Sequence, residues 1–467
     1  MDEGSYMRAE YETDTLIVGA GICGMASAIL AAQRGEKVAL LEQSPRVAPL
    51  LSGFEKDNIH FETGFTFASG LGQDEPLFNM FKQLDIQGLE FLPVREDGYD
   101  KYTFADSGFA YEFITGKERL IEQLKNLFPQ EKEKLDIFFT RIFQAKQNPS
   151  APQFRVSLEQ VLKELFTDER LRAVLALSSF LNGTPPSQLA FGDHVRFLGE
   201  MYDSVHRVKG GGKALVGAFV DCLSRHNIEI FTSCLVEKIE LADGGRKTLL
   251  TADGRLFSCK NCIVTAEPWQ FLSMFPQEAY SEQERSQIAA MKSTYGMFVV
   301  HCRHNGEAET RLCNRYYLPS LNIEQCFDLT ATPLFLQVNF SNIQPQTVNL
   351  LVPMSLTDSR FHPTSPDYER NKQIRAQRIL KGLEDVDPYL AAHLTPVAVS
   401  SRFDFTRINH SLGGMFGMMW DMSHTGLISF KTGVEGLYVA GQAVGGPGLR
   451  ASVSSAFSVN NIIMTTK

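Results

Sequence analysis

Hydrophobic residues near the start of the chain follow two different spacing patterns. Leu16, Ile17 and Val18 form an uninterrupted apolar run, which is typical of a short buried strand. In residues 25–34, small and apolar side chains recur at helical spacing, and residues 38–42, VALLE, again have the pattern of a strand. The pattern therefore predicts a strand, a helix and a second strand in succession, with glycines at the first joint.

The uncharged stretch 16–32 could also suggest a helix that crosses a membrane. A spanning helix needs about 20 apolar residues, and glycines inside it would weaken it. The glycines instead have the spacing GxGxxG. Gly19 permits a tight turn, Gly21 lets backbone amides approach a pyrophosphate, and Gly24 lets the helix pack closely on the strand. We therefore expect a dinucleotide at the start of this helix.

Glu42 ends the second predicted strand, about 20 residues after the glycines. A carboxylate at this place accepts hydrogen bonds from the adenosine ribose and repels a 2′-phosphate, so NADP is disfavoured. This pattern leaves FAD and NAD as alternatives.

Helical spacing dominates the next part of the chain. Three amphipathic stripes lie near residues 120–127, 135–143 and 158–165 and predict a helical cap over the site. From about 286 to 400, apolar and polar residues partly alternate, which predicts an antiparallel sheet, and a polar helix follows from 368.

Two later segments complete the predicted nucleotide domain. A glycine run at 210–212 precedes a helix, an extended run from 228 to 239 and a buried strand near 261–264. At the end of the chain, GLYVAG meets a glycine-rich turn and a helix that begins near Leu449. Because so apolar a segment cannot stand alone, we expect it to return to the first domain, where two distant segments would bind a flavin.

These patterns predict five ranges. They are a first part of the FAD-binding domain (11–109), a helical cap (110–205), a second part (206–285), a substrate domain of antiparallel sheet and helix (286–405), and a closing part (406–467).

Composition narrows the class of protein. The chain has 467 residues, 43% hydrophobic and 21% charged, with a formal charge of -9, so we expect no nucleic-acid partner. Its eight cysteines are scattered, and the CxxC of Cys259 and Cys262 lacks a second pair, so neither a disulfide framework nor a metal site is expected. The acidic start has no secretory pattern, which favours the cytoplasm.

Several segments in order resemble one family: the FAD-dependent carotenoid desaturases, carotenoid isomerases and retinol saturases, which are phytoene desaturase-like members of the amine-oxidase-like flavoproteins. The segments are TLIVGAGICGMASAILAAQRGEKVALLEQ, FETGFTFASGLG, NGTPPSQL, VKGGGKALV, SCLVEKIE, IVTAEP, SLGGMFGM and GLYVAGQ. The resemblance implies an α/β fold with a Rossmann-like FAD-binding domain, an antiparallel-sheet substrate domain and a helical cap.

The resemblance also implies where FAD binds. The pyrophosphate would lie on the three glycines, the adenosine ribose on Glu42, the adenine on the backbone of Val236, the ribityl chain on Gly441 and Gln442, and the isoalloxazine at the start of the closing helix. The implied cofactor-binding set is Gly19, Gly21, Gly24, Glu42, Gln43, Arg46, Val236, Gly441, Gln442, Gly448 and Leu449.

The chain departs from the family pattern in two places. Many relatives have Gly-Gly-Arg soon after the ribose acid, whereas here Arg46 is followed by Ala48, Pro49 and Leu50. Many also have Gly-Asp after the closing strand, whereas here it is Gly441-Gln442, and a glutamine can still hydrogen-bond a ribityl hydroxyl.

The resemblance implies hydride transfer between the flavin and an apolar polyene or isoprenoid lipid, in desaturation, saturation or cis–trans isomerisation. Because such substrates reside in bilayers, we expect peripheral membrane contact through the cap. The sequence does not reveal a pair of residues suited to general acid and base catalysis. Arg450 is a catalytic candidate beside flavin N1 and the C2 carbonyl, and His60 and His410 are weaker candidates.

Two alternatives remain open. One is an amine-oxidase-like flavoenzyme that acts on a small substrate. The other is a noncatalytic protein of the same fold that binds lipid or prenyl chains, as the Rab escort group does. The intact glycine pattern and Glu42 speak against the escort protein, and the missing Gly-Gly-Arg speaks for it.

Overall fold

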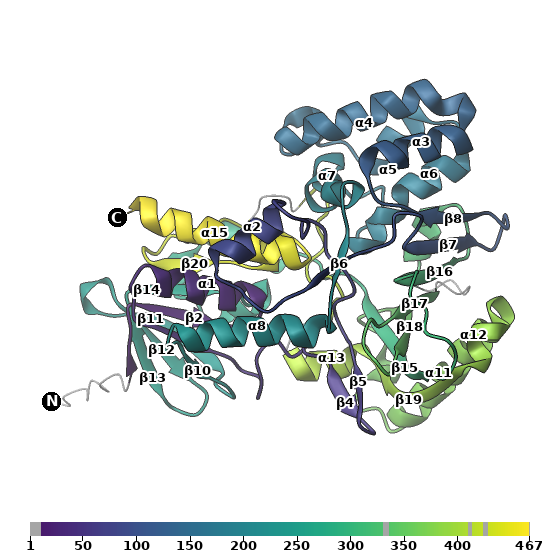
Figure 1. Ribbon diagram of the computed structural model, residues 1–467. Coiled ribbons are helices and arrows are strands. Elements are labelled where there is room, and N and C mark those ends of the chain that lie inside the picture. Colours follow the sequence, from purple (N-terminus) through teal and green to yellow (C-terminus); the bar gives the residue numbers. More distant parts are fainter. Residues whose placement is uncertain (1–10, 330–335, 410–412, 424–427, 467) are drawn as a thin grey trace.

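A computed structural model describes residues 11–329, 336–409, 413–423 and 428–466 (Figure 1). His410 lies outside the described residues. Within them, no helix is long and apolar enough to cross a membrane.

A five-stranded parallel sheet holds the predicted nucleotide half. Its strand order is β10 (Glu229–Phe231), β3 (Val38–Leu41), β2 (Thr15–Val18), β14 (Asn261–Val264) and β20 (Leu437–Val439). Between β2 and β3 runs α1 (Ile22–Gln33), so the predicted strand–helix–strand succession is confirmed. The pairing of β20 with β14 also confirms that the closing segment returns to the first sheet.

Both faces of this sheet are covered, which explains why its strands are apolar throughout. On one face, α8 (Gly211–Arg225) and α15 (Leu449–Thr466) pack with α1 in one apolar cluster (Figure 1). On the other face lies a four-stranded sheet, ordered β1 (Tyr11–Glu12), β13 (Leu256–Cys259), β12 (Lys247–Thr251) and β11 (Val236–Leu241).

One expected strand is divided. The run 228–239 forms β10 in the parallel sheet and β11 in the four-stranded sheet, with a break at 232–235. Ser233 in the break has a φ of 50°, a left-handed conformation that ends the extended run. The predicted extended run therefore contains two strands that belong to different sheets.

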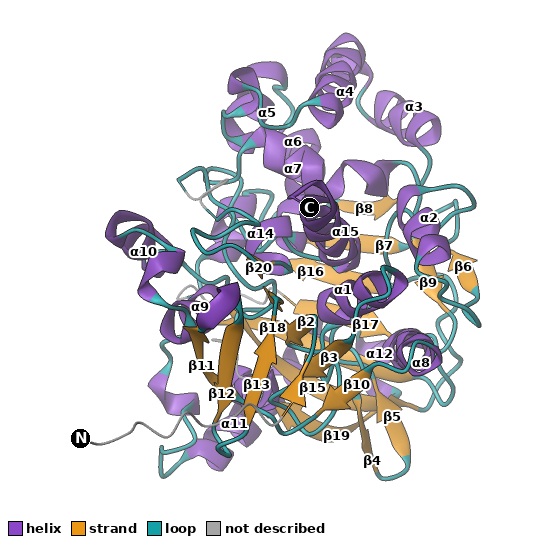
Figure 2. Cartoon of the chain, turned by 90° about the vertical axis from the view of Figure 1, so that its left-hand side faces the viewer, coloured by secondary structure: helices purple, strands orange, loops and turns teal. Residues whose placement is uncertain are grey.

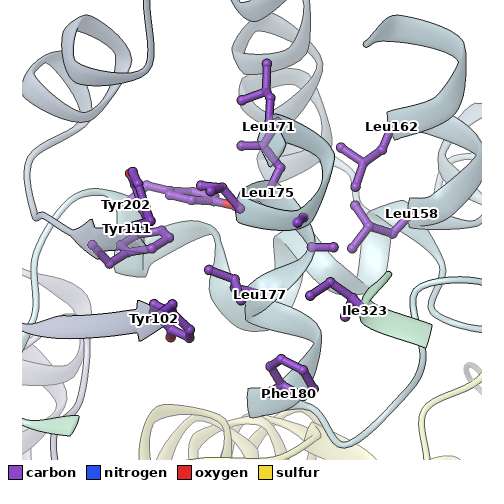
Figure 3. Packing of buried hydrophobic residues seen from close by; sticks show 14 of the residues in the cluster. Tyr102, Tyr111, Leu158, Leu162, Leu171, Leu175, Leu177, Phe180, Tyr202 and Ile323 are labelled. Carbon is purple, nitrogen blue, oxygen red and sulfur yellow. The ribbon is translucent and has the colours of Figure 1, made fainter. Parts of the chain in front are cut away.

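The helical cap consists of α3 (Lys117–Leu127), α4 (Lys132–Gln147), α5 (Leu158–Leu165), α6 (Glu169–Ala176) and α7 (Phe191–Leu198), gathered above the strands (Figure 2). The three predicted stripes therefore form helices α3, α4 and α5. Leu158, Leu162, Leu171 and Leu175 of the cap share one buried cluster with Tyr102 of the sheet below (Figure 3). This shared core fixes the cap to the sheet.

A seven-stranded sheet lies under the cap. Its order is β19 (Leu394–Ser400), β15 (Gly296–His304), β18 (Thr347–Met354), β17 (Leu336–Phe340), β16 (Asn314–Leu318), β7 (Asp100–Phe104) and β8 (Ala110–Phe113). It is antiparallel as expected, except that β16 and β7 run parallel. The predicted α/β class with two such sheets is confirmed. The five ranges stay a prediction, and β7 and β8 fall outside the range 286–405.

The remaining elements connect these layers. Helices α11 (Tyr368–Val386) and α12 (Pro388–Ala392) cover the far face of the seven-stranded sheet. The other elements are β4 (Phe54–Lys56), β5 (Ile59–Phe61), α2 (Pro76–Gln83), β6 (Phe91–Pro93), β9 (His206–Val208), α9 (Pro268–Met274), α10 (Glu282–Ala289), α13 (Arg402–Asn409) and α14 (Gln442–Gly445).

A row of buried polar residues crosses the seven-stranded sheet. The register aligns Asp100, Asn314, Asn339, Asn349 and His301 on five neighbouring strands. Residues directly opposite each other in a sheet face the same side, so their polar groups can meet. The Asn314 amide donates to Asp100 at 2.8 Å, the Asn339 amide donates to Asn314 at 3.0 Å, and Asn349 Oδ1 lies 2.7 Å from His301 Nδ1. We call these five residues the polar row.

The polar row predicts a pH-dependent stability. Burial raises the pKa of Asp100 from 3.8 to about 7, so the folded state keeps a proton that the unfolded chain releases above pH 4. This stabilisation is fully present below pH 3.8 and is lost as the pH rises through about 7. As the pH rises from 3.8 to about 7, the free energy of unfolding of Asp100→Asn should therefore increase relative to that of the wild type, by roughly 4 kcal/mol. Urea unfolding of both proteins from pH 4 to 8 measures this change. A difference between their free energies of unfolding that stays constant with pH would contradict the prediction.

Candidate functional site

One cavity of about 840 Å3 joins the two large sheets. On one side it is lined by Val18, Leu41, Thr265 and Gly441, each at or just after the carboxyl end of a strand of the parallel sheet. Ligands of open α/β sheets bind at this edge. On the other side, the cavity reaches the seven-stranded sheet.

The glycine turn after β2 has three different environments. Gly19 has a φ of 100°, and a Cβ there would lie 2.4 Å from Thr265 Oγ1. A Cβ on Gly24 would lie 1.9 Å from the carbonyl oxygen of Gly19, so only glycine permits this helix–turn contact. At Gly21, by contrast, a Cβ would meet nothing within 4 Å. The turn is therefore closely packed on two sides and open on the side of the cavity.

The start of α1 offers donors to this open space. Gly21 is the N-cap, no side-chain cap is seen among the described residues, and the first turn contains no acidic residue. The first amides of a helix lack partners within the helix, and the helix dipole is positive there. An anionic group of a ligand fits this place.

Glu42 lies at the wall of the same cavity and is buried. Its Oε2 accepts a hydrogen bond from the amide of Ala20 at 2.7 Å, and its Oε1 accepts one from the amide of Ser44 at 2.8 Å. A carboxylate can accept about four hydrogen bonds, so capacity for ligand hydroxyls remains. Gln43 also lines the cavity.

Arg46 occupies a different place. Its side chain is exposed, is not among the described residues that line the cavity, and donates to the carbonyl of Gly53 at 2.6 Å. Its observed contacts hold the loop after β3. Ala48 lines the cavity with a φ of 39°, a left-handed conformation in a residue other than glycine.

The remaining predicted cofactor residues come from distant segments. Val236 lines the cavity as the first residue of β11. Gly441 has a φ of 90°, and its amide donates to Ser455 Oγ at 2.7 Å. Gln442, Gly448 and Leu449 also line the cavity. The structure thus brings nine of the eleven predicted cofactor residues to one cavity; Gly24 packs against the turn at Gly19, and Arg46 lies on the loop after β3.

Arg450 and His60 do not reach the cavity. On α15, Leu449 and Ser452 line it, whereas Arg450 is turned about 100° around the helix from Leu449. Arg450 is therefore not among the described residues that line the cavity, and its catalytic role stays a prediction. His60, on β5, is partly buried, and burial lowers its pKa; its nearest acid is Glu55, with Nδ1 and Oε1 separated by 4.0 Å.

The half of the cavity near the seven-stranded sheet is mainly apolar. Its apolar lining comes from the loop after β5, the turn after α6, the sheet with the residue before it, and residues on either side of 410–412. It consists of Phe65, Phe67, Phe180, Leu181, Tyr295, Met297, Val299, Leu351, Phe405, Met415 and Phe416. The sheet adds a few polar groups, namely Asn314, Tyr316, Gln337, Asn339 and Asn349. An apolar pocket with few polar groups is typical of a small-molecule site.

Sequence reasoning did not single out two polar residues of this wall. Glu62 is 5% exposed, burial raises its pKa, and its Oε1 accepts from the amide of Gly212 at 3.3 Å. Asn182 is fully buried, and its side-chain amide has no hydrogen-bond partner among the described residues. Both lie in segments quoted for the family resemblance, FETGF and NGTPP, but a single acid or amide carries no periodic signal.

The half of the cavity near the parallel sheet fits FAD. It combines open space at Gly21, helix amides without a side-chain cap, and the buried carboxylate of Glu42. These groups match a pyrophosphate and a ribose. No group of His, Cys, Asp and Glu suited to a metal occurs among the described residues, and Cys259 and Cys262 are buried free thiols at β13 and β14.

Two related proteins each match about half of the chain. All-trans-retinol 13,14-reductase of Danio rerio is 24% identical over 266 residues, which are 50% of this chain and 44% of that protein. The 4,4'-diapolycopen-4-al dehydrogenase of Metabacillus indicus is 22% identical over 289 residues, 56% of this chain and 57% of that one. The chain thus covers about half the length of these relatives.

Solved structures share the fold. An oxidoreductase from Methanosarcina mazei has a TM-score of 0.68 at 15% identity and covers 96% of this chain and 100% of its own. Putrescine oxidase bound to putrescine has a TM-score of 0.68 at 17% identity, with coverages of 97% and 99%. The model of the family "Flavin containing amine oxidoreductase" matches residues 22–456, which agrees with FAD as the cofactor. The chain therefore belongs to the family of flavin containing amine oxidoreductases.

Proposed function

We propose that the protein is an FAD-dependent oxidoreductase that desaturates, saturates or isomerises carbon–carbon double bonds of an apolar polyene or isoprenoid lipid. The observation that carries the proposal is one continuous cavity, which runs from the glycine turn to a wall rich in Phe, Leu, Met and Val side chains. Relatives named as a retinol reductase and as diapophytoene desaturases support this substrate class.

The residues that would hold FAD follow from the cavity wall. The amides at the start of α1 would bind the pyrophosphate beside Gly21, Glu42 would bind the adenosine ribose, and Gly441 and Gln442 would contact the ribityl chain. When bound, FAD accepts or donates hydride. The chain itself orients the ligand and keeps water away through its aromatic wall.

Saturation of a double bond also needs a proton. Glu62 lies on the cavity wall, and the amide of Asn349 in the polar row donates to its backbone oxygen at 2.7 Å. Burial raises the pKa of Glu62, which favours the protonated form of its carboxyl. We propose Glu62 as the residue that supplies this proton.

The glycine turn yields a paired prediction about FAD. Gly21→Ala places a methyl group in the open space, so it should weaken FAD binding about tenfold or more and change the stability of the apoprotein by only about 0.5 kcal/mol. Gly24→Ala should instead destabilise the apoprotein, because its Cβ overlaps the backbone. Fluorescence titration with FAD and thermal unfolding of the apoproteins measure both effects. Unchanged FAD affinity in Gly21→Ala would contradict the assignment.

The role of Glu62 predicts a kinetic effect. Glu62→Gln keeps an oxygen that can accept from Gly212 but removes the proton, so kcat for saturation should fall about 100-fold or more with little change in KM. The assay uses reduced holoprotein and all-trans-retinol, and Glu55→Gln, an exposed acid outside the cavity, is the matched control. Equal kcat values for the wild type and Glu62→Gln would exclude the role.

Product analysis tests the proposed function itself. Holoprotein, with its flavin reduced in one sample and oxidised in another, is incubated with all-trans-retinol, phytoene or putrescine, and products are identified by chromatography and mass spectrometry. We expect a polyene to gain or lose two hydrogens, or to change isomer without a change in mass, while putrescine stays intact. Oxidation of putrescine alone would establish the small-amine alternative.

A further inference from the structure

Two amide side chains stand side by side on the cavity floor. Gln337 and Asn339 are two residues apart on β17, so they point to the same face of the sheet, and both line the cavity. The wall around them is mainly apolar, including Leu351 on the neighbouring strand and Met297 and Val299 on the next. Amides in such surroundings need hydrogen-bond partners.

The hydrogen bonds around Asn314 fix the orientation of both amides. The Asn314 amide nitrogen donates to Asp100 Oδ1 at 2.8 Å, which leaves Asn314 Oδ1 to accept hydrogen bonds. This oxygen accepts from Gln337 Nε2 at 3.1 Å and from Asn339 Nδ2 at 3.0 Å. Both NH2 groups therefore face Asn314, at nearly equal distances from one atom.

Each of these NH2 groups has a second acceptor in the protein. Gln337 Nε2 lies 3.3 Å from the hydroxyl of Tyr316, and Asn339 Nδ2 lies 2.5 Å from Thr66 Oγ1. An amide NH2 has two hydrogens, so the donor capacity of both side chains is used within the protein. What remains on each side chain is its carbonyl oxygen.

These two oxygens have no protein donor. Gln337 Oε1 and Asn339 Oδ1 accept no hydrogen bond from the described residues, yet neither atom is fully enclosed. Since both residues line the cavity and their NH2 groups are bound within the protein, we infer that the oxygens face the cavity. If a bound ligand excludes water and offers no donor, an acceptor left unpaired destabilises the complex. A ligand with a matching donor is therefore favoured over one without.

We propose that Gln337 and Asn339 form a subsite for the hydroxyl group at the polar end of an otherwise apolar ligand, so that the substrate class is a polyene or isoprenoid alcohol. An ester, an ether, an aldehyde or a hydrocarbon offers these oxygens no donor. An ammonium group would need a carboxylate beside it, and the neutral amide of Asn314 separates both side chains from Asp100. This inference rests on the proposed function and adds the polar group of the substrate.

The test compares all-trans-retinol with its methyl ether, which has the same polyene but no O–H donor. Dissociation constants for the oxidised holoprotein are measured anaerobically from the change in polyene fluorescence. We expect retinol to bind about tenfold or more tightly than the ether, because one buried hydrogen bond is lost. Since this comparison needs no substitution, it does not depend on the folding of a variant.

Two variants locate the effect. Gln337→Met removes one of the two acceptors at similar volume and should lower the ratio of the two dissociation constants, by weakening retinol more than the ether. Leu351→Met, directly opposite Gln337 in the register, is the matched control and should keep the wild-type ratio.

Equal binding of retinol and ether by the wild type, or an unchanged preference in Gln337→Met, would overturn the subsite and leave the proposed function intact. Failure of both polyenes to bind the holoprotein would overturn the proposed function and the subsite together.

Discussion

The contact between α1 and the turn at Gly19 is the constraint on which the rest of the structure depends. The backbone of the turn leaves no room for a side chain at Gly24, so the helix starts directly at the edge of the parallel sheet. This close start points the helix amides into the cavity. It also places α1 where the closing helix α15 packs along it, so that the end of the chain completes the cavity wall.

Local sequence patterns sufficed to predict much of the parallel sheet and the helices that pack on it. The strands β2 and β3 are short and wholly apolar because helices and a second sheet cover both faces, and α1 is recognisable from small residues at helical spacing. The resemblance to known flavoproteins then supplied the distant residues, and Val236, Gly441 and Gln442 do lie at the same cavity. Their binding roles stay predictions.

The sequence could not reveal features that arise from pairing between distant strands. The polar row takes each of its residues from a different strand, so no segment shows a polar cluster. Strands β7 and β8 join the sheet from far upstream, and the parallel pair of β7 and β16 breaks the expected antiparallel order. Arg450 was predicted from its place at the start of a helix, but the direction of a side chain around a helix depends on tertiary packing, and Arg450 is not among the described residues that line the cavity; its role stays a prediction.

The proposed function requires that one cavity holds an apolar ligand against bound flavin. The most direct measurement is a titration of oxidised, anaerobic holoprotein with all-trans-retinol, in which the flavin absorption bands and the fluorescence of the polyene are followed together. We expect a shift of the flavin absorption bands that saturates at one polyene per flavin. Its midpoint should equal that of the fluorescence change. Polyene binding that leaves the flavin bands unchanged would place the ligand elsewhere and contradict the claim.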